Sequence, residues 1–203
     1  MANERTVLNI VHPYTYKQIG ENCIMGPVEK YHERDKKVST FVNSALDSGV
    51  RVLWHKMYDD NINQMMREAS LHFDPLFSFL FDSRIKSFNT PKSGVPIPDT
   101  KQGKLTDEQL QMLKKIFVSS SGLKEIVNPA KNLLFIGGML ECCVSNCIGF
   151  FANNYMPNER KLLYVPELCV IHDRAYWKEI KPKLDDLNAT PISYSEALSF
   201  LSQ

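Results

Sequence analysis

Short segments of almost uninterrupted apolar residues alternate along this chain with segments whose apolar residues recur at helical spacing. The segments with strand character are residues 6–11 (TVLNIV), 50–55 (VRVLWH), 133–136 (LLFI) and 161–165 (KLLYV). Strands that are apolar on both faces are typical of parallel sheets that helices cover on both sides. The sequence therefore predicts an α/β fold, a three-layer α/β/α sandwich with a mainly parallel sheet.

Helical segments are predicted between and after these strands. They comprise residues 38–48, 61–73, 106–117, 143–153, 174–187 and 195–201, with a further helix starting over residues 123–127. Residues 77–99 are predicted to be irregular, because proline and glycine interrupt any regular pattern there. A chain of 203 residues, 43% of them apolar, is long enough to bury one core, so we expect a single domain over residues 1–203.

The charge balance limits the classes of partner. There are 24 basic and 23 acidic side chains, so the formal net charge is +1, which indicates neither nucleic acid nor an anionic membrane as a partner. The run KYHERDKK (residues 30–37) mixes both signs and is interpreted as a solvated helix face. No stretch approaches the roughly 18 apolar residues of a membrane span, and the N-terminal segment lacks the features of a secretory signal.

The cysteines indicate the cellular compartment. Five is an odd number, and the spacing of Cys142, Cys143 and Cys147 fits neither a disulfide framework nor a zinc site. We therefore expect a reduced, cytoplasmic protein. Cys147 lies one helical turn after Cys143 and is interpreted as a core residue.

The stretch IGGMLECCV runs from the clearest strand into a predicted helix. Gly137 and Gly138 let the backbone turn and let a ligand approach closely. A cysteine in the first turn of the helix, such as Cys143, lies near unpaired N–H groups and the positive end of the helix dipole, which favour the nucleophilic thiolate. The same N–H groups are suited to bind an oxyanion. The alternative is that the cysteine pair packs as small apolar residues.

Residues 136–169 resemble the signature region of the isochorismatase-like (cysteine hydrolase) superfamily. The family pattern is a strand, a glycine, an acidic or polar residue, one spacer, and then Cys-Val opening a helix. The positions that match are Gly137, Glu141, Cys143 and Val144, followed by Asn154, Tyr155, a strand over residues 162–165 and Glu167. Residues 190–201 are similar to the closing strand and helix of the family, and residues 46–56 to its second strand with the preceding helix end.

The resemblance implies a metal-independent hydrolase without a cofactor, with Cys143 as the nucleophile. Its partner would be a small-molecule substrate with an amide, ester or related C–N or C–O bond. It also implies an assisting lysine, for which Lys115 is the first choice and Lys114, Lys101 and Lys104 are alternatives. Asn9 falls where the family has its aspartate base, and an amide has no useful basicity. His12 is a possible substitute base, although a histidine beside proline is typical of a surface turn.

The remaining site residues follow from the same resemblance. Tyr14, Gly138, Met139 and Cys142 are expected to line the substrate site, and the protein is expected to be a homo-oligomer. The metal-binding arrangement of some family members is not matched around His55, which is interpreted as a core or rim residue. Two alternatives stay open. One is a catalytically impaired family member that binds a small molecule or acts through oligomer contacts, and the other is a redox role for the Cys142/Cys143 pair.

Overall fold

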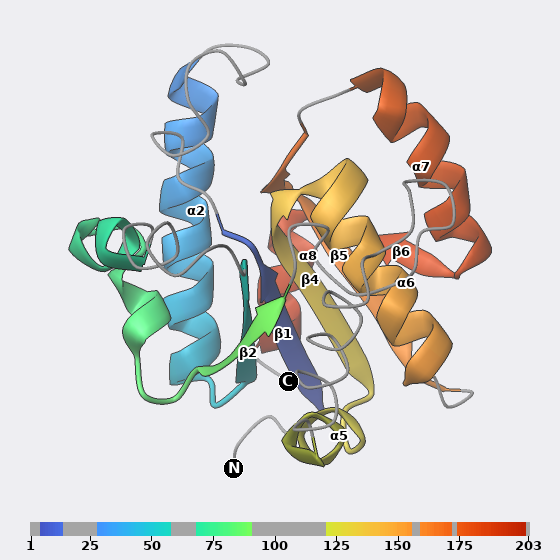
Figure 1. Ribbon diagram of the computed structural model, residues 1–203, viewed down its shortest axis with the longest axis horizontal. Helices are drawn as coiled ribbons and strands as arrows, with labels where there is room; N and C mark the ends of the chain where they lie inside the picture. Colours follow the sequence, from blue (N-terminus) through green and yellow to red (C-terminus); the bar gives the residue numbers. More distant parts are fainter. Residues whose placement is uncertain are drawn as a thin grey trace, which may run out of the picture.

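The computed structural model describes residues 5–13, 28–57, 68–90, 121–155, 159–171 and 174–201, and its core is an all-parallel sheet between two helical layers (Figure 1). The strands are β1 (Thr6–Val11), β2 (Arg51–Met57), β3 (Lys86–Thr90), β4 (Asn132–Met139), β5 (Lys161–Val170) and β6 (Ala189–Pro191). The helices are α2 (Val28–Asp47), α5 (Ser121–Val127), α6 (Ser145–Asn154), α7 (Arg174–Asp186) and α8 (Tyr194–Leu201), with a 3-10 turn η2 (Ser78–Phe81) and a π-helical turn η3 (Leu140–Val144).

The six strands are arranged in the order β3-β2-β1-β4-β5-β6, and every neighbouring pair is parallel. Successive strands are added on one side of β1 up to β3, and on the other side from β4 onward. The topology therefore reverses between β1 and β4, and in open parallel sheets a ligand binds beyond the carboxyl ends of the strands at this point. The predicted three-layer α/β/α fold is confirmed.

Two apolar cores explain why the strands read as continuous apolar runs. Val7 and Val11 of β1 point into the core beneath α5, α6 and α7, whereas Leu8 and Ile10 point into the core beneath α2 and α8. Because both faces of β1 are buried, its sequence does not show the alternation of apolar and polar residues that a strand with one solvent-exposed face would have. Asn9 lies on the α6 side of β1 together with Val7 and Val11, since side chains alternate along a strand.

Several element boundaries differ from the prediction. β3 lies within the segment predicted to be irregular; it is an edge strand whose Lys86 and Ser87 are exposed, so it lacks an apolar pattern. Helix α2 begins at Val28, ten residues earlier than predicted, and its added turns carry mostly polar residues. The helix predicted over residues 106–117 lies outside the described residues, and of the one predicted over residues 61–73 the structure describes residues 68–73 as helical.

Strand β5 is also longer than predicted, because it continues beyond Pro166 to Val170. Its pairing with β4 is interrupted: Tyr164 pairs with Phe135, and the next paired residue, Cys169, faces Gly137. Two steps along β4 therefore correspond to five along β5, so the intervening residues bulge out of the ladder. This bulge carries Pro166 and Glu167 to the carboxyl edge of the sheet.

Candidate active site

The two glycines at the end of β4 are required by the end of β1. Gly137 has φ of +129°, and a Cβ atom there would overlap the Val11 carbonyl oxygen and lie 2.8 Å from the Val11 nitrogen. At Gly138 a Cβ atom would lie 2.7 Å from the His12 oxygen. The sequence-based expectation was that these glycines admit a ligand. The structure shows that they admit the backbone of the neighbouring strand, which brings the ends of β1 and β4 together.

The cysteine pair follows at once, but the local structure differs from the prediction. The helix was predicted to begin at Cys143, whereas η3 contains Cys142 and Cys143 and α6 begins at Ser145. The Cys143 side chain is 5% exposed, whereas Cys142 is half-buried. Cys143 shares its core with the fully buried Cys147, as predicted for the latter.

The Cys143 thiol is neutral in this environment. Its pKa is raised well above the ordinary value, first by the hydrogen bond with the Cys142 side chain and then by burial, and the charge of Glu141 adds to the effect. The expectation of a thiolate favoured by the helix terminus is therefore not supported. The physical reason is that the hydrogen bond with Cys142, the burial and the nearby negative charge together favour the thiol more than the backbone hydrogen bond favours the thiolate.

Asn9 lies within β1 and is held by two hydrogen bonds. Its Nδ2 donates to the Leu134 oxygen at 3.4 Å, and its Oδ1 accepts from His55 Nε2 at 3.1 Å. Asn9 pairs with Phe135, whereas Val11 pairs with Gly137. At about 3.3 Å per residue, Asn9 lies about 7 Å short of the strand end. The position on the same face at the strand end belongs to Val11, which is apolar.

His55 is a buried core residue, as predicted. Because an amide oxygen only accepts, the bond to Asn9 places the proton of the neutral ring on Nε2. The ring lies edge-on to Phe151, with ring centres 6.0 Å apart. Burial lowers the pKa of His55 to about 4. Asn9 therefore orients a neutral histidine and is itself fully buried within the sheet.

This histidine predicts a pH dependence of stability. Since the folded-state pKa of about 4 lies below the ordinary 6.5, the unfolded chain binds a proton first as the pH falls. The contribution of His55 is complete above pH 6.5 and is lost between about 6.5 and 4. We expect the free energy of unfolding to fall by about 2 kcal/mol from this group between pH 7 and pH 5. Urea unfolding at both values, compared with His55→Gln, measures it; an equal slope in both proteins would contradict the assignment.

His12 differs from its sequence interpretation as a surface turn residue. It is 2% exposed, has φ of +43°, and donates its backbone N–H to the His55 oxygen at 3.0 Å. Its Nε2 lies 2.6 Å from Thr90 Oγ1, and the Thr90 hydroxyl also lies 3.0 Å from the Lys56 oxygen. His12 therefore ties the end of β1 to the ends of β2 and β3.

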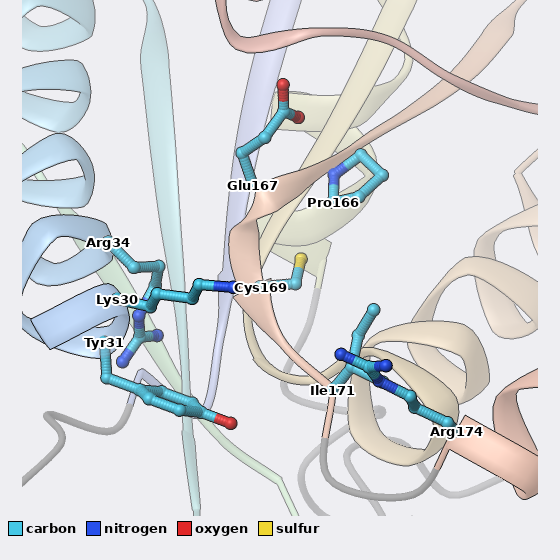
Figure 2. Close-up of a pocket in the computed structure, with 8 residues that line it drawn as sticks. All are labelled: Lys30, Tyr31, Arg34, Pro166, Glu167, Cys169, Ile171 and Arg174. Atoms are coloured by element: carbon cyan, nitrogen blue, oxygen red, sulfur yellow. The ribbon is translucent and has the colours of Figure 1, made fainter. Parts of the chain in front are cut away.

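A pocket of about 230 Å³ opens beyond the carboxyl end of β5, between α2 and the start of α7 (Figure 2). Its lining residues are Lys30, Tyr31, Arg34, Pro166, Glu167, Cys169, Ile171 and Arg174. The interpretation of residues 30–37 as a solvated helix face is wrong for one side of α2, where Tyr31, Arg34 and Asp35 are buried. It is right for the other side, where Glu33, Lys36 and Lys37 are exposed. A signal was present: Tyr31, Arg34 and Val38 follow helical spacing and continue the apolar face of α2.

Other site residues were named from the sequence. Gly138 and Met139 end β4 beside the cysteine pair, so these two and Cys142 lie together at the β4 end. Tyr14 and Lys115 lie outside the described residues, as do the alternative lysines. Within the described part of the chain, no three histidine, cysteine, aspartate or glutamate side chains are grouped so that they could hold a metal ion. None of the described helices is long and apolar enough to cross a membrane.

Comparisons with known proteins identify the fold class. No protein-family model and no curated protein sequence matches the chain. Among solved structures, the MAR1 ribonuclease from Caenorhabditis elegans matches with a TM-score of 0.63 at 10% identity, over 99% of this chain and 83% of that chain. An isochorismatase from Pseudomonas putida matches with a TM-score of 0.56 at 12% identity, over 97% and 91%.

A third match is the YcaC gene product from Escherichia coli, described as an octameric hydrolase of unknown specificity, with a TM-score of 0.53 at 10% identity over 98% of this chain and 79% of that chain. The six-stranded parallel sheet flanked by helices matches the fold of these structures. This chain has the α/β fold of the isochorismatase-like hydrolases. At sequence identities of 10 to 12%, these matches show the fold alone, so the chemistry has to be argued from the site residues.

Proposed function

We propose that this protein is a cysteine hydrolase of the isochorismatase-like fold, acting on a small amide, ester or related C–N or C–O bond with Cys143 as the nucleophile. One observation carries the proposal: Cys143 follows β4 directly, at the switch point where the carboxyl ends of β1 and β4 meet. This edge is where ligands bind in open parallel sheets. The resemblance of residues 136–169 to the family signature places the family cysteine at the same residue.

The reaction would proceed through an acylated cysteine. Cys143 Sγ forms a bond to the carbonyl carbon and gives up its proton, and the C–N or C–O bond breaks as the leaving group takes a proton. Water then adds to the thioester, which releases the acid and restores the thiol. Cys142 is hydrogen-bonded to Cys143 and is suited to pass the proton on. Lys115 is proposed to stabilise the negative charge on the carbonyl oxygen, in a reaction that needs no metal.

Acylation of the thiol tests this proposal. We expect p-nitrophenyl acetate to release one equivalent of p-nitrophenol per chain in a fast phase, with the acetyl group mapped to Cys143 by mass spectrometry. Because the thiol is neutral at rest, the rate should rise with pH. Cys143→Ala should lower the rate of this phase about 10³-fold or more.

Cys147→Ala is the matched control, since Cys147 lies in the same core and is fully buried. It should keep the fast phase. Equal acylation in Cys143→Ala and the wild type, or acetyl groups spread over other cysteines, would rule out the nucleophile.

A second function is favoured by a specific observation, the absence of a carboxylate along the described β1. Val11 occupies the strand end and the Asn9 amide is engaged with His55. In this alternative the protein binds a small molecule without turnover, and the acylation experiment would show no fast phase. In either case we propose a homo-oligomer, for which the octameric description of the E. coli protein is the support.

A further inference from the structure

The pocket beyond β5 collects positive charge. Lys30 and Arg34 lie on successive turns of α2, and Arg174 is the first residue of α7. Figure 2 shows the Lys30 amine extending from α2 and the Arg174 guanidinium directed toward it from α7, with the Arg34 guanidinium beneath Lys30 and close to the Tyr31 ring. Two separate elements thus supply cations to one small cavity, an arrangement suited to an oxyanion.

Of the negative groups nearby, Asp35 offsets the charge of Arg34, with which it forms an ion pair, whereas Glu167 does not face the cations. Glu167 is the one carboxylate among the lining residues, and Figure 2 shows it turned away from the three cations. Its Oε1 accepts a hydrogen bond from the Tyr194 backbone N–H at the start of α8, at 3.2 Å. Cys169 is a neutral thiol, because burial raises its pKa to about 12.

Arg34 is held in place for this role. Its guanidinium lies 2.5 Å from the Asp35 carboxylate, and both residues are buried, Arg34 being 6% exposed. Burial lowers the pKa of Arg34 and Asp35 opposes that shift, so the guanidinium remains charged at neutral pH. Asp35 does not line the pocket. Because the Arg34 side chain is already fixed, it loses little conformational freedom when an anion binds beside the exposed Lys30 and Arg174.

We propose that this pocket is a binding site for a small oxyanion with two negative charges, either a phosphate or a dicarboxylate, held by Lys30, Arg34 and Arg174. The volume of about 230 Å³ admits a small molecule rather than a polymer. The site goes beyond the proposed hydrolysis, because it requires no reaction at Cys143. It lies at the same edge of the sheet, since Cys169 of its lining pairs with Gly137.

Isothermal titration calorimetry on the full chain at low ionic strength tests the site, with inorganic phosphate and malonate as separate probes. We expect saturable binding of at least one probe, with phosphate alone indicating a phosphate ligand and malonate alone a dicarboxylate. Lys30→Ala and Arg174→Ala should each weaken binding about tenfold, because each removes a charged hydrogen-bond donor. Added salt should weaken binding as well.

Lys36→Ala and Lys178→Ala are the matched controls. They remove the same charge from exposed positions of α2 and α7 that do not line the pocket, and they should leave the affinity unchanged. Binding of neither probe overturns the proposal, and so does an equal loss of affinity in the controls. Cys143→Ala should bind the anion as the wild type does, so failure of the hydrolase proposal and failure of this site are seen separately.

Discussion

Gly137→Ala is expected to lower the free energy of unfolding by about 4 kcal/mol, the largest loss of stability expected for any of these substitutions. Two costs add at this residue. The φ of +129° is a conformation that residues with a side chain rarely adopt, and the new Cβ would overlap the carbonyl of Val11. The atoms in contact belong to the backbone of β1, which cannot move aside without breaking its pairing with β4.

The free energy of unfolding in urea measures the effect, and Gly49→Ala is its control. Gly49 has φ of +72° and follows the end of α2, where its N–H donates to the Leu46 oxygen at 3.1 Å. Alanine there is expected to cost only about 1 kcal/mol, because backbone strain acts without the overlap with β1. If the two variants lose equal stability, the close approach of β1 to β4 is not what requires Gly137.

Asn9→Asp is expected to destabilise the protein by about 3 kcal/mol at pH 8 and to leave acylation of Cys143 no faster. The new carboxylate would be fully buried, and its oxygen would face the Leu134 carbonyl in place of the amide that now donates to it. The carboxylate would also lie against His55 and raise its pKa from about 4. The loss of stability between pH 6.5 and 4 should therefore be smaller than in the wild type.

The activity measurement separates two roles for Asn9. A residue that orients His55 within the sheet gives no gain of acylation when it becomes acidic, since it lies about 7 Å short of the strand end. Asn9→Leu is the control for shape: it removes the acceptor of His55 without adding charge, and should cost about 1 to 3 kcal/mol. A clear increase in acylation of Cys143 in Asn9→Asp would show instead that Asn9 occupies the position of the missing base.

Part of the candidate site was accessible from sequence and part was not. The junction with Gly137 and the cysteine pair could be located, because glycines after a buried strand mark a turn whatever the tertiary packing is. The pKa of Cys143 could not, since burial and the contacts with Cys142 and Glu141 decide it. The local sequence indicates where a helix begins, but it does not indicate how far the fold removes solvent from the thiol.

The register of the sheet was equally hidden. The sequence places Asn9 in a strand and at the family's aspartate, and only the pairing of Asn9 with Phe135 shows that it lies within the sheet. Two polar residues, His12 and Arg34, were assigned to the surface because polar residues are mostly exposed. Both are buried. Thr90, which is distant in sequence, hydrogen-bonds to His12, and the neighbouring Asp35 carboxylate pairs with Arg34.

The amino-acid sequence by itself determined the class of fold. Strands apolar on both faces must be covered on both faces, so alternating strands and helices lead to a parallel sheet between two helical layers. Tertiary structure alone decided which charged side chains converge. Lys30 and Arg34 are separated from Arg174 by more than a hundred residues, and only the packing of α2 beside the end of β5 brings them to one pocket. Hydrophobic periodicity is a local signal, whereas an electrostatic site is made by proximity in space.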